Sequence, residues 1–419
     1  MSFRYFSLYF ASIGLKEAGL IFFYSCLSAL LANNKTNIKK YFNNKEIYLF
    51  SSARGALSAF FQANNIKDGD SVLLSSFTCL AVPTAVIASG ARPIYADINP
   101  LTLNMNFEEI KEKVQNHTKV IVVQHTMGRP MDDMDKIIEF ATKKNILVIE
   151  DCALSLGSSD EGKKVGLIGD AAIFSLELSK TLSSGWGGIL VNNNAKLTRS
   201  LDTFYNKIDY EPSLVRIRKL IQIIITGIFY NKYIYFLGKY IVSIAYKIRF
   251  FKGSTPSHEY DGKVSSAFVS KLGKTQAIFA NNQLKRAQKI SNINNKNFIS
   301  IKNSLELAGL NVLGDINSKH FPVSPRICFL VKDKINANKW FFKRGIELGS
   351  WFDGSLSELP IFNFDKSHFI NVSRVARHIV NLPCHNKITD SDLNYLDKII
   401  KDFVEENPKE RNFNFFKVK

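Results

Sequence analysis

Short apolar runs alternate with helical stretches between residues 47 and 192 of the chain. The runs are bounded by polar or turn-forming residues, which is typical of buried strands; they are Ile47–Ser51, Ser71–Leu74, Pro93–Ala96, Lys119–Val123, Ile146–Ile149 and Ala171–Phe174. Helices are predicted over Ala56–Ala63, Phe107–Val114 and Asp133–Lys143. This alternation predicts an α/β fold with a mainly parallel, doubly wound sheet that has helices on both faces.

The same pattern divides the chain into four parts. Residues 1–46 form an apolar and basic N-terminal segment, and residues 47–204 form the large domain. Residues 205–262 are a basic, apolar insertion, whereas residues 263–419 return to ordinary polarity and include a smaller C-terminal α/β domain. A length of 419 residues suits such a pair of domains.

The insertion combines apolar residues with uncompensated positive charge. Between Pro212 and Lys252 there are eight Lys and Arg residues and no Asp or Glu. On one continuous helix, Lys232, Lys239 and Lys247 would share a face within about 80°. We expect a segment that lies in the plane of an anionic membrane surface, because the run is too interrupted by charge to span a bilayer. A dimer interface or a hydrophobic lid is the alternative.

Composition narrows the class of partner. The net charge of +18 predicts anionic partners, although a lysine-rich genome bias accounts for part of it. Nucleic acid is disfavoured, because large apolar content contributes little to a phosphate-backbone contact. The five cysteines are scattered and lack CxxC spacing, which indicates a reducing compartment and neither disulfides nor a metal site. We therefore expect a cytoplasmic protein with peripheral contact to the inner face of the membrane.

Three short segments carry candidate chemistry. Asp151 ends one predicted strand, Ser175 ends another and precedes Lys180 by five positions, and a glycine-rich run follows at 184–188. Pyridoxal phosphate (PLP) chemistry needs a lysine amine, a carboxylate that keeps the pyridine nitrogen protonated, and hydroxyl or backbone N–H groups for the phosphate. Each residue alone is more often a surface lysine, a cap or a turn hydroxyl. Their order and spacing favour PLP binding.

Five segments resemble the DegT/StrS family of PLP-dependent sugar aminotransferases, in order and register; they are Asp68–Thr78, Gly90–Ile98, His125–Pro130, Ile149–Asp151 and Phe174–Gly188. The resemblance implies PLP fold type I and a homodimer with active sites at the subunit interface. It implies that Lys180 binds the cofactor covalently and that Asp151 faces the pyridine nitrogen. Ser175 and the backbone amides around Ala53 and Arg54 would then hold the phosphate.

Some positions depart from the family pattern. Ala53-Arg54 replaces Gly-Thr before the first helix, and the guanidinium suits a phosphate. Cys79 stands where an aromatic residue usually stacks on the pyridine ring, and Leu154 replaces a polar residue. His125 has two interpretations of equal weight, a cofactor contact and a structural histidine at a strand end.

The sequence therefore predicts an aminotransferase that moves an amino group from an amino acid, with glutamate expected, to a keto sugar. The sugar would be nucleotide-linked or lipid-linked, for polysaccharide or glycoconjugate synthesis. Retention of Lys180 favours transamination, because relatives that have become dehydratases carry histidine there. The alternatives are another PLP reaction, such as elimination, and a catalytically weak, membrane-associated PLP protein with a regulatory or complex-partner role.

Overall fold

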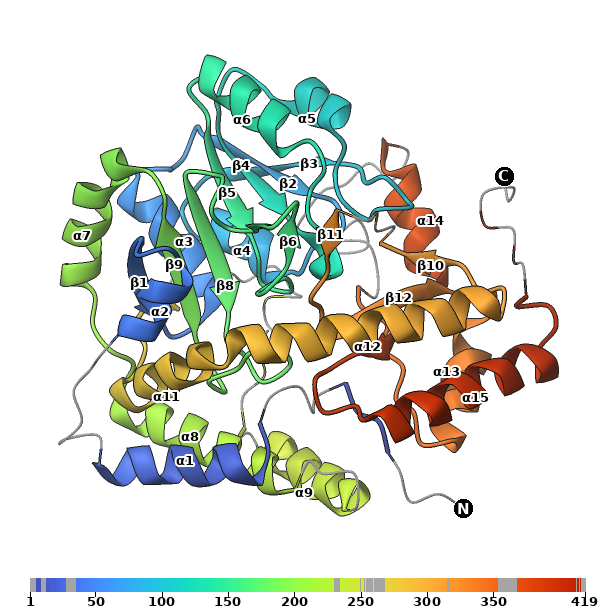
Figure 1. The fold of residues 1–419 in the computed structure, drawn as a ribbon. Coiled ribbons are helices and arrows are strands. Elements are labelled where there is room, and N and C mark those ends of the chain that lie inside the picture. Colours follow the sequence, from blue (N-terminus) through green and yellow to red (C-terminus); the bar gives the residue numbers. More distant parts are fainter. Residues whose placement is uncertain are drawn as a thin grey trace.

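The computed structural model describes residues 5–8, 13–27, 35–229, 234–248, 250–251, 253, 259, 268–314, 317, 319–352, 368–411, 413 and 415. Its centre is a seven-stranded sheet with the order β1-β9-β8-β5-β4-β2-β3 (Figure 1). The strands are β1 (Glu46–Phe50), β2 (Ser71–Ser75), β3 (Arg92–Ala96), β4 (Thr118–Gln124), β5 (Leu147–Asp151), β8 (Ala171–Ser175) and β9 (Gly188–Asn192). The five strands from β3 to β8 pair in parallel, whereas β9 runs antiparallel to both of its neighbours, β8 and β1. The predicted α/β fold is confirmed.

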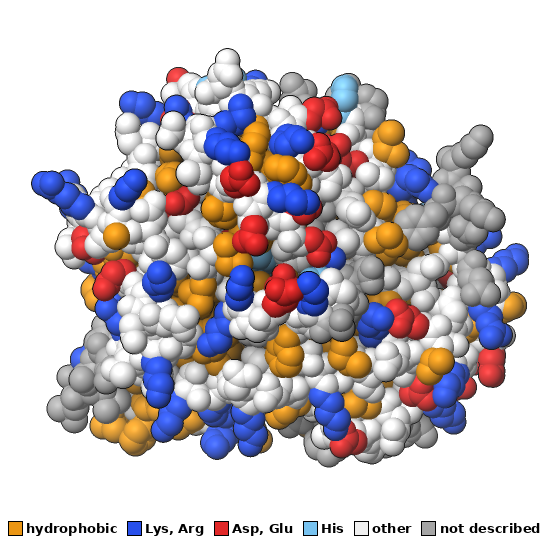
Figure 2. Space-filling model, turned by 45° about the horizontal axis from the view of Figure 1, so that its top comes forward, with side chains coloured by type: hydrophobic (Ala, Val, Ile, Leu, Met, Phe, Trp, Pro, Cys, Tyr) orange, Lys and Arg blue, Asp and Glu red, His pale blue; other side chains and the backbone are white. Residues whose placement is uncertain are grey.

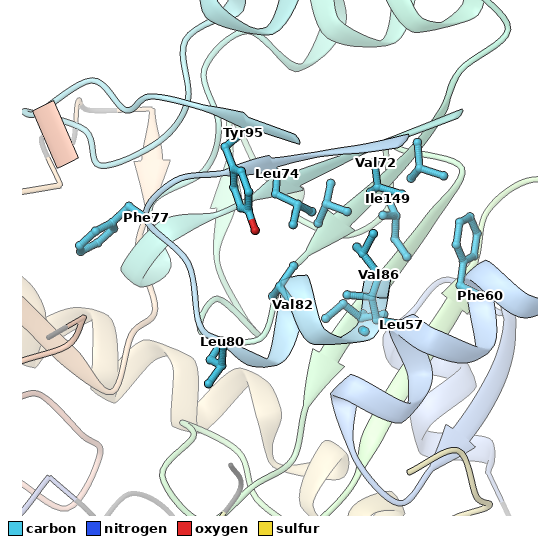
Figure 3. Packing of buried hydrophobic residues seen from close by; sticks show 14 of the residues in the cluster. Leu57, Phe60, Val72, Leu74, Phe77, Leu80, Val82, Val86, Tyr95 and Ile149 are labelled. Carbon is cyan, nitrogen blue, oxygen red and sulfur yellow. The ribbon is translucent and has the colours of Figure 1, made fainter. Parts of the chain in front are cut away.

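Helices cover both faces of this sheet because its side chains alternate between them. On one face, Val72, Leu74 and Ile149 pack against α3 (Ala53–Ala63) and α4 (Ala81–Ile87), as Figure 3 shows. On the other face, α5 (Phe107–Lys113) and α6 (Met134–Lys143) cover Leu73 and its neighbours. Near β1 and β9, that second face is covered by α2 (Thr36–Tyr41) and α11 (Lys274–Lys285). Further along the chain, α7 (Thr198–Lys207) packs on α3.

A second, smaller domain contains a three-stranded antiparallel sheet with the order β10-β12-β13. These strands are β10 (Val312–Leu313), β12 (Arg326–Leu330) and β13 (Ile379–Pro383), and its helices are α13 (Lys334–Lys343), α14 (Ile370–His378) and α15 (Asp390–Glu406). The long helix α12 (Ala287–Leu307) runs from the large domain to this sheet (Figure 1). A third small sheet joins β6 (Ser159–Asp160), β7 (Lys163–Lys164) and β11 (His320–Phe321). The four-part division of the chain stays a prediction.

The insertion forms two helices that lie beside the N-terminal helix. α8 (Ser213–Phe229) packs against α1 (Leu15–Leu27) and against α9 (Tyr235–Lys247), and the three lie below the large domain in Figure 1. The expectation that Lys232 shares a helical face with Lys239 and Lys247 stays a prediction, because α9 is described only from Tyr235 to Lys247. Lys232 lies outside the described residues, and Lys239 pairs with Glu347 at 3.2 Å. No helix in the described ranges has the length and apolarity needed to cross a bilayer.

Candidate active site

The carboxyl ends of β5 and β8 bring the predicted acid, serine and lysine to one edge of the sheet. The two strands are parallel neighbours, and Asp151 is paired with Ile173, two residues before Ser175. The chain then turns back through a loop that returns to β9, with the Leu176 N–H donating to the Gly187 carbonyl at 2.9 Å. Lys180 lies on this loop, so its side chain is presented at the edge where ligands bind in open α/β sheets.

The amine of Lys180 is held away from solvent. The residue is 9% exposed, and its Nζ forms no hydrogen bond or ion pair with the residues that the structure describes. Burial lowers the pKa of Lys180, although the nearby Glu177 and Asp151 carboxylates oppose the shift. A lower pKa increases the neutral fraction of the amine, and the neutral form is the nucleophile that attacks a carbonyl.

The Asp151 carboxylate is also buried and faces the same space. Its Oδ1 accepts the Ala153 N–H at 2.9 Å, which fixes the orientation of the side chain. Burial raises the pKa of Asp151, whereas the charge of Lys180 acts in the opposite direction. A protonated pyridine nitrogen would supply the compensating positive charge that this carboxylate needs.

Ser175 adjoins the N-terminus of α3. Its partner in the sheet is Gly188, which is also the partner of Phe50 at the end of β1. A Cβ atom at Gly188 would overlap the backbone of Ser52 and Ala53, so only glycine permits this approach. Ser52 caps α3 by accepting the Gly55 N–H at 3.0 Å. The Ser175 hydroxyl and the first amides of α3 thus form a cradle suited to a phosphate.

Arg54 lies in the first turn of the same helix, but its guanidinium has a protein partner. Arg54 Nη1 forms a buried ion pair with Glu259 Oε1, and its guanidinium lies 5.5 Å from the Phe268 ring. Arg54 is 8% exposed and Glu259 is 1% exposed. The sequence pattern gave no indication of Glu259. The predicted contact between Arg54 and a phosphate stays a prediction, and this acid would lie beside that contact.

Cys79 lies within electrostatic range of Lys180, whereas its predicted place against the pyridine ring stays a prediction. Burial raises the pKa of its thiol, while the charges of Lys180 and Arg54 lower it.

Two residues that sequence reasoning missed come from the small domain. Lys180 Nζ is 5.2 Å from the centroid of the Trp351 ring, and the guanidinium of Arg326 is 3.6 Å from the same centroid. Both domains therefore contribute to the site.

His125 is held inside the protein by both ring nitrogens. Its Nδ1 accepts the Met131 N–H at 3.0 Å, so the proton is on Nε2, which donates to Glu150 at 2.9 Å. Glu150 also accepts backbone N–H groups from Gly166, Ile168 and Gly169. This arrangement favours the structural interpretation of His125. Cys152 lies close to both side chains, but their mutual bonds give no reason to infer a metal site.

These residues fit PLP in three respects. A buried lysine amine, a buried carboxylate and a glycine-dependent cradle at a helix N-terminus lie around one edge of the sheet. When bound, PLP supplies a ring that accepts electrons from the substrate carbon. Lys180 would hold the cofactor and move a proton at that carbon, Asp151 would hold the ring nitrogen, and Ser175 would hold the phosphate.

Comparison with known proteins agrees with this geometry. Residues 33–208 match the DegT/DnrJ/EryC1/StrS aminotransferase family. GDP-perosamine synthase of Escherichia coli O157:H7 is 35% identical over 202 residues, which cover 46% of this chain and 55% of that enzyme. The chain spans about half of the length of the curated relatives it matches.

Solved structures extend the likeness over nearly the whole fold. Helicobacter pylori PseC, an aminotransferase involved in the biosynthesis of pseudoaminic acid, superposes with a TM-score of 0.74 at 15% identity, over 96% of this chain and 100% of that one. An aminotransferase from Psychrobacter cryohalolentis gives a TM-score of 0.73 at 19% identity, with 96% and 99% coverage. At these identities the superpositions establish the shared fold.

Proposed function

We propose that this chain is a PLP-dependent sugar aminotransferase, because residues 33–208 match the DegT/DnrJ/EryC1/StrS aminotransferase family. The observation that carries the proposal is the buried Lys180 amine, which faces Asp151 at the carboxyl edge of the sheet. An amine in this state is costly to keep buried unless it serves a ligand. Ser175 and the N-terminus of α3 supply the cradle for the cofactor phosphate.

The substrate would be a keto sugar, and the amino donor an amino acid such as glutamate. Support comes from relatives whose names specify sugar products or substrates, including GDP-perosamine synthase and a dTDP-4-dehydro-2,3,6-trideoxy-D-glucose 4-aminotransferase. Both names describe nucleotide-linked sugars. A lipid-linked keto sugar is the alternative substrate, which we would expect if the protein attaches to a membrane.

The lysine assignment has a direct test. Purified protein incubated with PLP should develop the visible absorbance of lysine-bound cofactor, and borohydride reduction should fix the label on the peptide that contains Lys180. We expect Lys180→Ala to abolish both the label and turnover, because the substitution removes the amine that would bind the cofactor covalently. Lys164, a partly buried lysine over the ring of Tyr41, is a suitable control for substitution. A label that persists in Lys180→Ala would refute the proposal.

Glutamate then separates the proposed reaction from its alternatives. An aminotransferase should convert bound PLP to pyridoxamine phosphate and release 2-oxoglutarate in a single turnover. An eliminating enzyme would leave PLP in its original form, and a regulatory PLP protein would bind the cofactor without turnover.

The proposal includes two kinds of association. A homodimer is implied by the family resemblance, and the mass of the protein in solution tests it.

Contact with an anionic membrane is supported by the outward faces of α1, α8 and α9. Leu214, Ile217 and Ile221 are exposed on α8 at helical spacing, and Leu237, Tyr240 and Ile244 repeat that spacing on α9. Apolar and cationic side chains alternate along the lower edge of the molecule in Figure 2.

A further inference from the structure

We propose that a groove between α3 and α7 binds a nucleoside diphosphate. The groove has a volume of about 510 Å³, which lies within the range of small-molecule sites. One wall comes from Gln62 and Ala63 at the end of α3, and the other comes from residues 196–207, which lead into α7 and run along it. This site goes beyond the proposed function and does not depend on it.

The groove lies apart from the candidate active site. The first residues of α3 form the cradle for the cofactor phosphate, whereas the groove is at the other end of this helix. The eleven residues of α3 span about 16 Å. α7 lies on the flank of the large domain that faces away from the small domain (Figure 1). The groove and the cradle therefore share a helix, but no described residue of the cradle lines the groove.

Three cations line the groove. They are Lys196, Arg199 and Lys207, and all three side chains are exposed to solvent. Within the part of the chain that the structure describes, no Asp or Glu lines the groove and none of the three cations forms an ion pair. Arg199 and Lys207 share one side of α7, with Thr203 between them. A cleft lined by charge of one sign raises the local concentration of counter-ions, so this groove favours an anion.

Several other exposed lysines on helices differ from these, because they are paired. Lys136 pairs with Asp133 at 2.8 Å, and Lys401 pairs with Asp397 at 2.7 Å, each about one helical turn away. A general excess of lysine in the chain does not explain why the cations of the groove gather without acids.

Two acids that are close to the groove in sequence have partners elsewhere. The Asp202 carboxylate accepts a hydrogen bond from the Tyr48 hydroxyl at 2.8 Å. Glu211 pairs with Lys219 of α8 at 2.6 Å. Neither carboxylate lines the groove, so a bound ligand is the counter-charge that its cations would take.

Phosphate groups suit this set of cations. Arg199 presents a planar fork that binds phosphate in a bidentate manner, and the two lysines act as mobile point charges. A nucleoside diphosphate carries about three negative charges near pH 7, because its terminal phosphate has a pKa of about 6. Its charge therefore matches that of the three cations together.

The rest of the lining favours a nucleotide over a bare phosphate. Phe204 is half-buried in the groove wall, and an aromatic ring can stack with any base. Gln62 Nε2 donates to Ser58 Oγ at 3.0 Å, and the Gln62 carbonyl oxygen can accept a hydrogen bond from a base. A nucleic acid would need cations along several successive phosphates, whereas this groove has room for about one nucleotide.

Lysine footprinting of the full-length protein tests the site directly. Exposed amines are acetylated with and without GDP, and the extent at each lysine is measured by peptide mass spectrometry. We expect GDP to slow acetylation of Lys196 and Lys207 by about threefold or more, because bound phosphates cover their amines. Lys339 and Lys343, exposed lysines of α13, are internal references and should react at the same rate throughout.

Two double variants with equal changes in charge measure the contribution of the cations. Arg199→Glu/Lys207→Glu leaves Lys196 in place, so the GDP concentration that protects Lys196 reports the affinity of the groove itself. We expect this variant to weaken the affinity by about tenfold or more, since acids would then face the phosphates. Lys339→Glu/Lys343→Glu, the matched control, should stay within about twofold of wild type. Arg199→Lys, which keeps the charge without the fork, should show a smaller loss.

The choice of probe decides what the groove recognises. GDP should protect Lys196 and Lys207 at lower concentration than pyrophosphate does, and guanosine should not protect them. Equal protection by pyrophosphate and GDP would overturn the nucleotide assignment, and protection by guanosine would show that phosphate is not recognised. Stronger protection by a single-stranded oligonucleotide would assign the groove to nucleic acid. Unchanged acetylation of both lysines in the presence of GDP would refute the site altogether.

Discussion

Arg54 and Glu259 form a buried ion pair next to the predicted phosphate cradle. If Arg54 contacts the phosphate, Arg54→Ala should weaken PLP binding by about tenfold or more, because a charge-assisted hydrogen bond contributes about 1.5–3 kcal/mol. Glu259→Gln should keep or improve the affinity, since it removes an anion beside the phosphate. Titration of cofactor absorbance measures both. If Arg54 serves only Glu259, the two variants should lower thermal stability to a similar degree and leave PLP affinity unchanged.

We predict that Asp151 affects the chemical step more than it affects cofactor binding. Asp151→Asn keeps the shape and the acceptor for the Ala153 N–H but removes the negative charge that stabilises a protonated ring nitrogen. We expect Asp151→Asn to raise the activation free energy of transamination by several kcal/mol and so to slow the reaction. The change in PLP affinity should be smaller. Single-turnover rates at saturating PLP measure the effect. A near-normal rate would show that another group protonates the ring.

The residues that could be predicted are those whose positions follow from local pattern. Asp151, Ser175 and Lys180 lie at or just after strand ends, so their meeting follows from a parallel sheet. Glu259, Arg326 and Trp351 reach the site from distant parts of the chain, where no spacing rule connects them to Lys180. Their burial becomes evident only when the two domains are packed together.

At the scale of elements, α8 packs directly on the loop that carries Lys180. Gly185 has φ +84°, and a Cβ atom there would overlap the Ile223 side chain, while Trp186 is buried in the same cluster. Gly185→Ala should therefore cost about 1–3 kcal/mol for overpacking, in addition to about 1–2 kcal/mol for the left-handed backbone. Thermal or denaturant unfolding measures the loss.

Gly69 provides the control for this prediction. It has φ +88°, and an added Cβ would meet no atom within 4 Å, so Gly69→Ala should cost the backbone term alone. Ile223→Ala in the Gly185→Ala background should recover part of the overpacking cost, a coupling that a double-mutant cycle isolates. Equal losses for Gly69→Ala and Gly185→Ala would show that α8 does not pack there in solution.

Element prediction succeeded where periodicity was strong and failed where it was weak. Each of the six predicted strands overlaps a strand of the central sheet, because buried runs bounded by turns are distinctive. α4 was missed, since its residues are apolar on nearly every side and carry Pro83.

At the scale of the whole molecule, the candidate active site depends on contact between the two domains. Lys180 and Asp151 come from the large domain, whereas Trp351 and Arg326 come from the small one. α12 joins the domains and packs on both (Figure 1). α1, α8 and α9 lie on another side, and their inner face reaches the lysine loop through Ile223. One layer of packed side chains thus separates the outer surface of these helices from the loop that carries Lys180.

The outer surface leads to a prediction about membranes. Leu15, Phe22 and Phe23 on α1 are exposed, as are the apolar stripes of α8 and α9, and exposed apolar residues gathered on packed helices suit an interaction site. Intact protein should co-sediment with anionic vesicles, because apolar side chains enter the interface while each nearby Lys or Arg contributes about 1 kcal/mol. The charge contribution should weaken as salt rises, since screening shortens it to roughly 8–10 Å, whereas the apolar contribution persists.

Two double variants with equal changes in charge distinguish binding through this surface from nonspecific binding to vesicles. Leu214→Glu/Tyr240→Glu alters exposed apolar residues of α8 and α9, whereas Leu307→Glu/Ile335→Glu alters equally exposed ones on α12 and α13. The first should release the protein from anionic vesicles, and the second should leave binding close to that of the intact chain. Equal release by both would indicate a nonspecific effect of charge. Failure of the intact chain to bind vesicles, with a smaller solution mass for the first variant alone, would identify the surface as a dimer interface and make a soluble nucleotide-sugar the expected substrate.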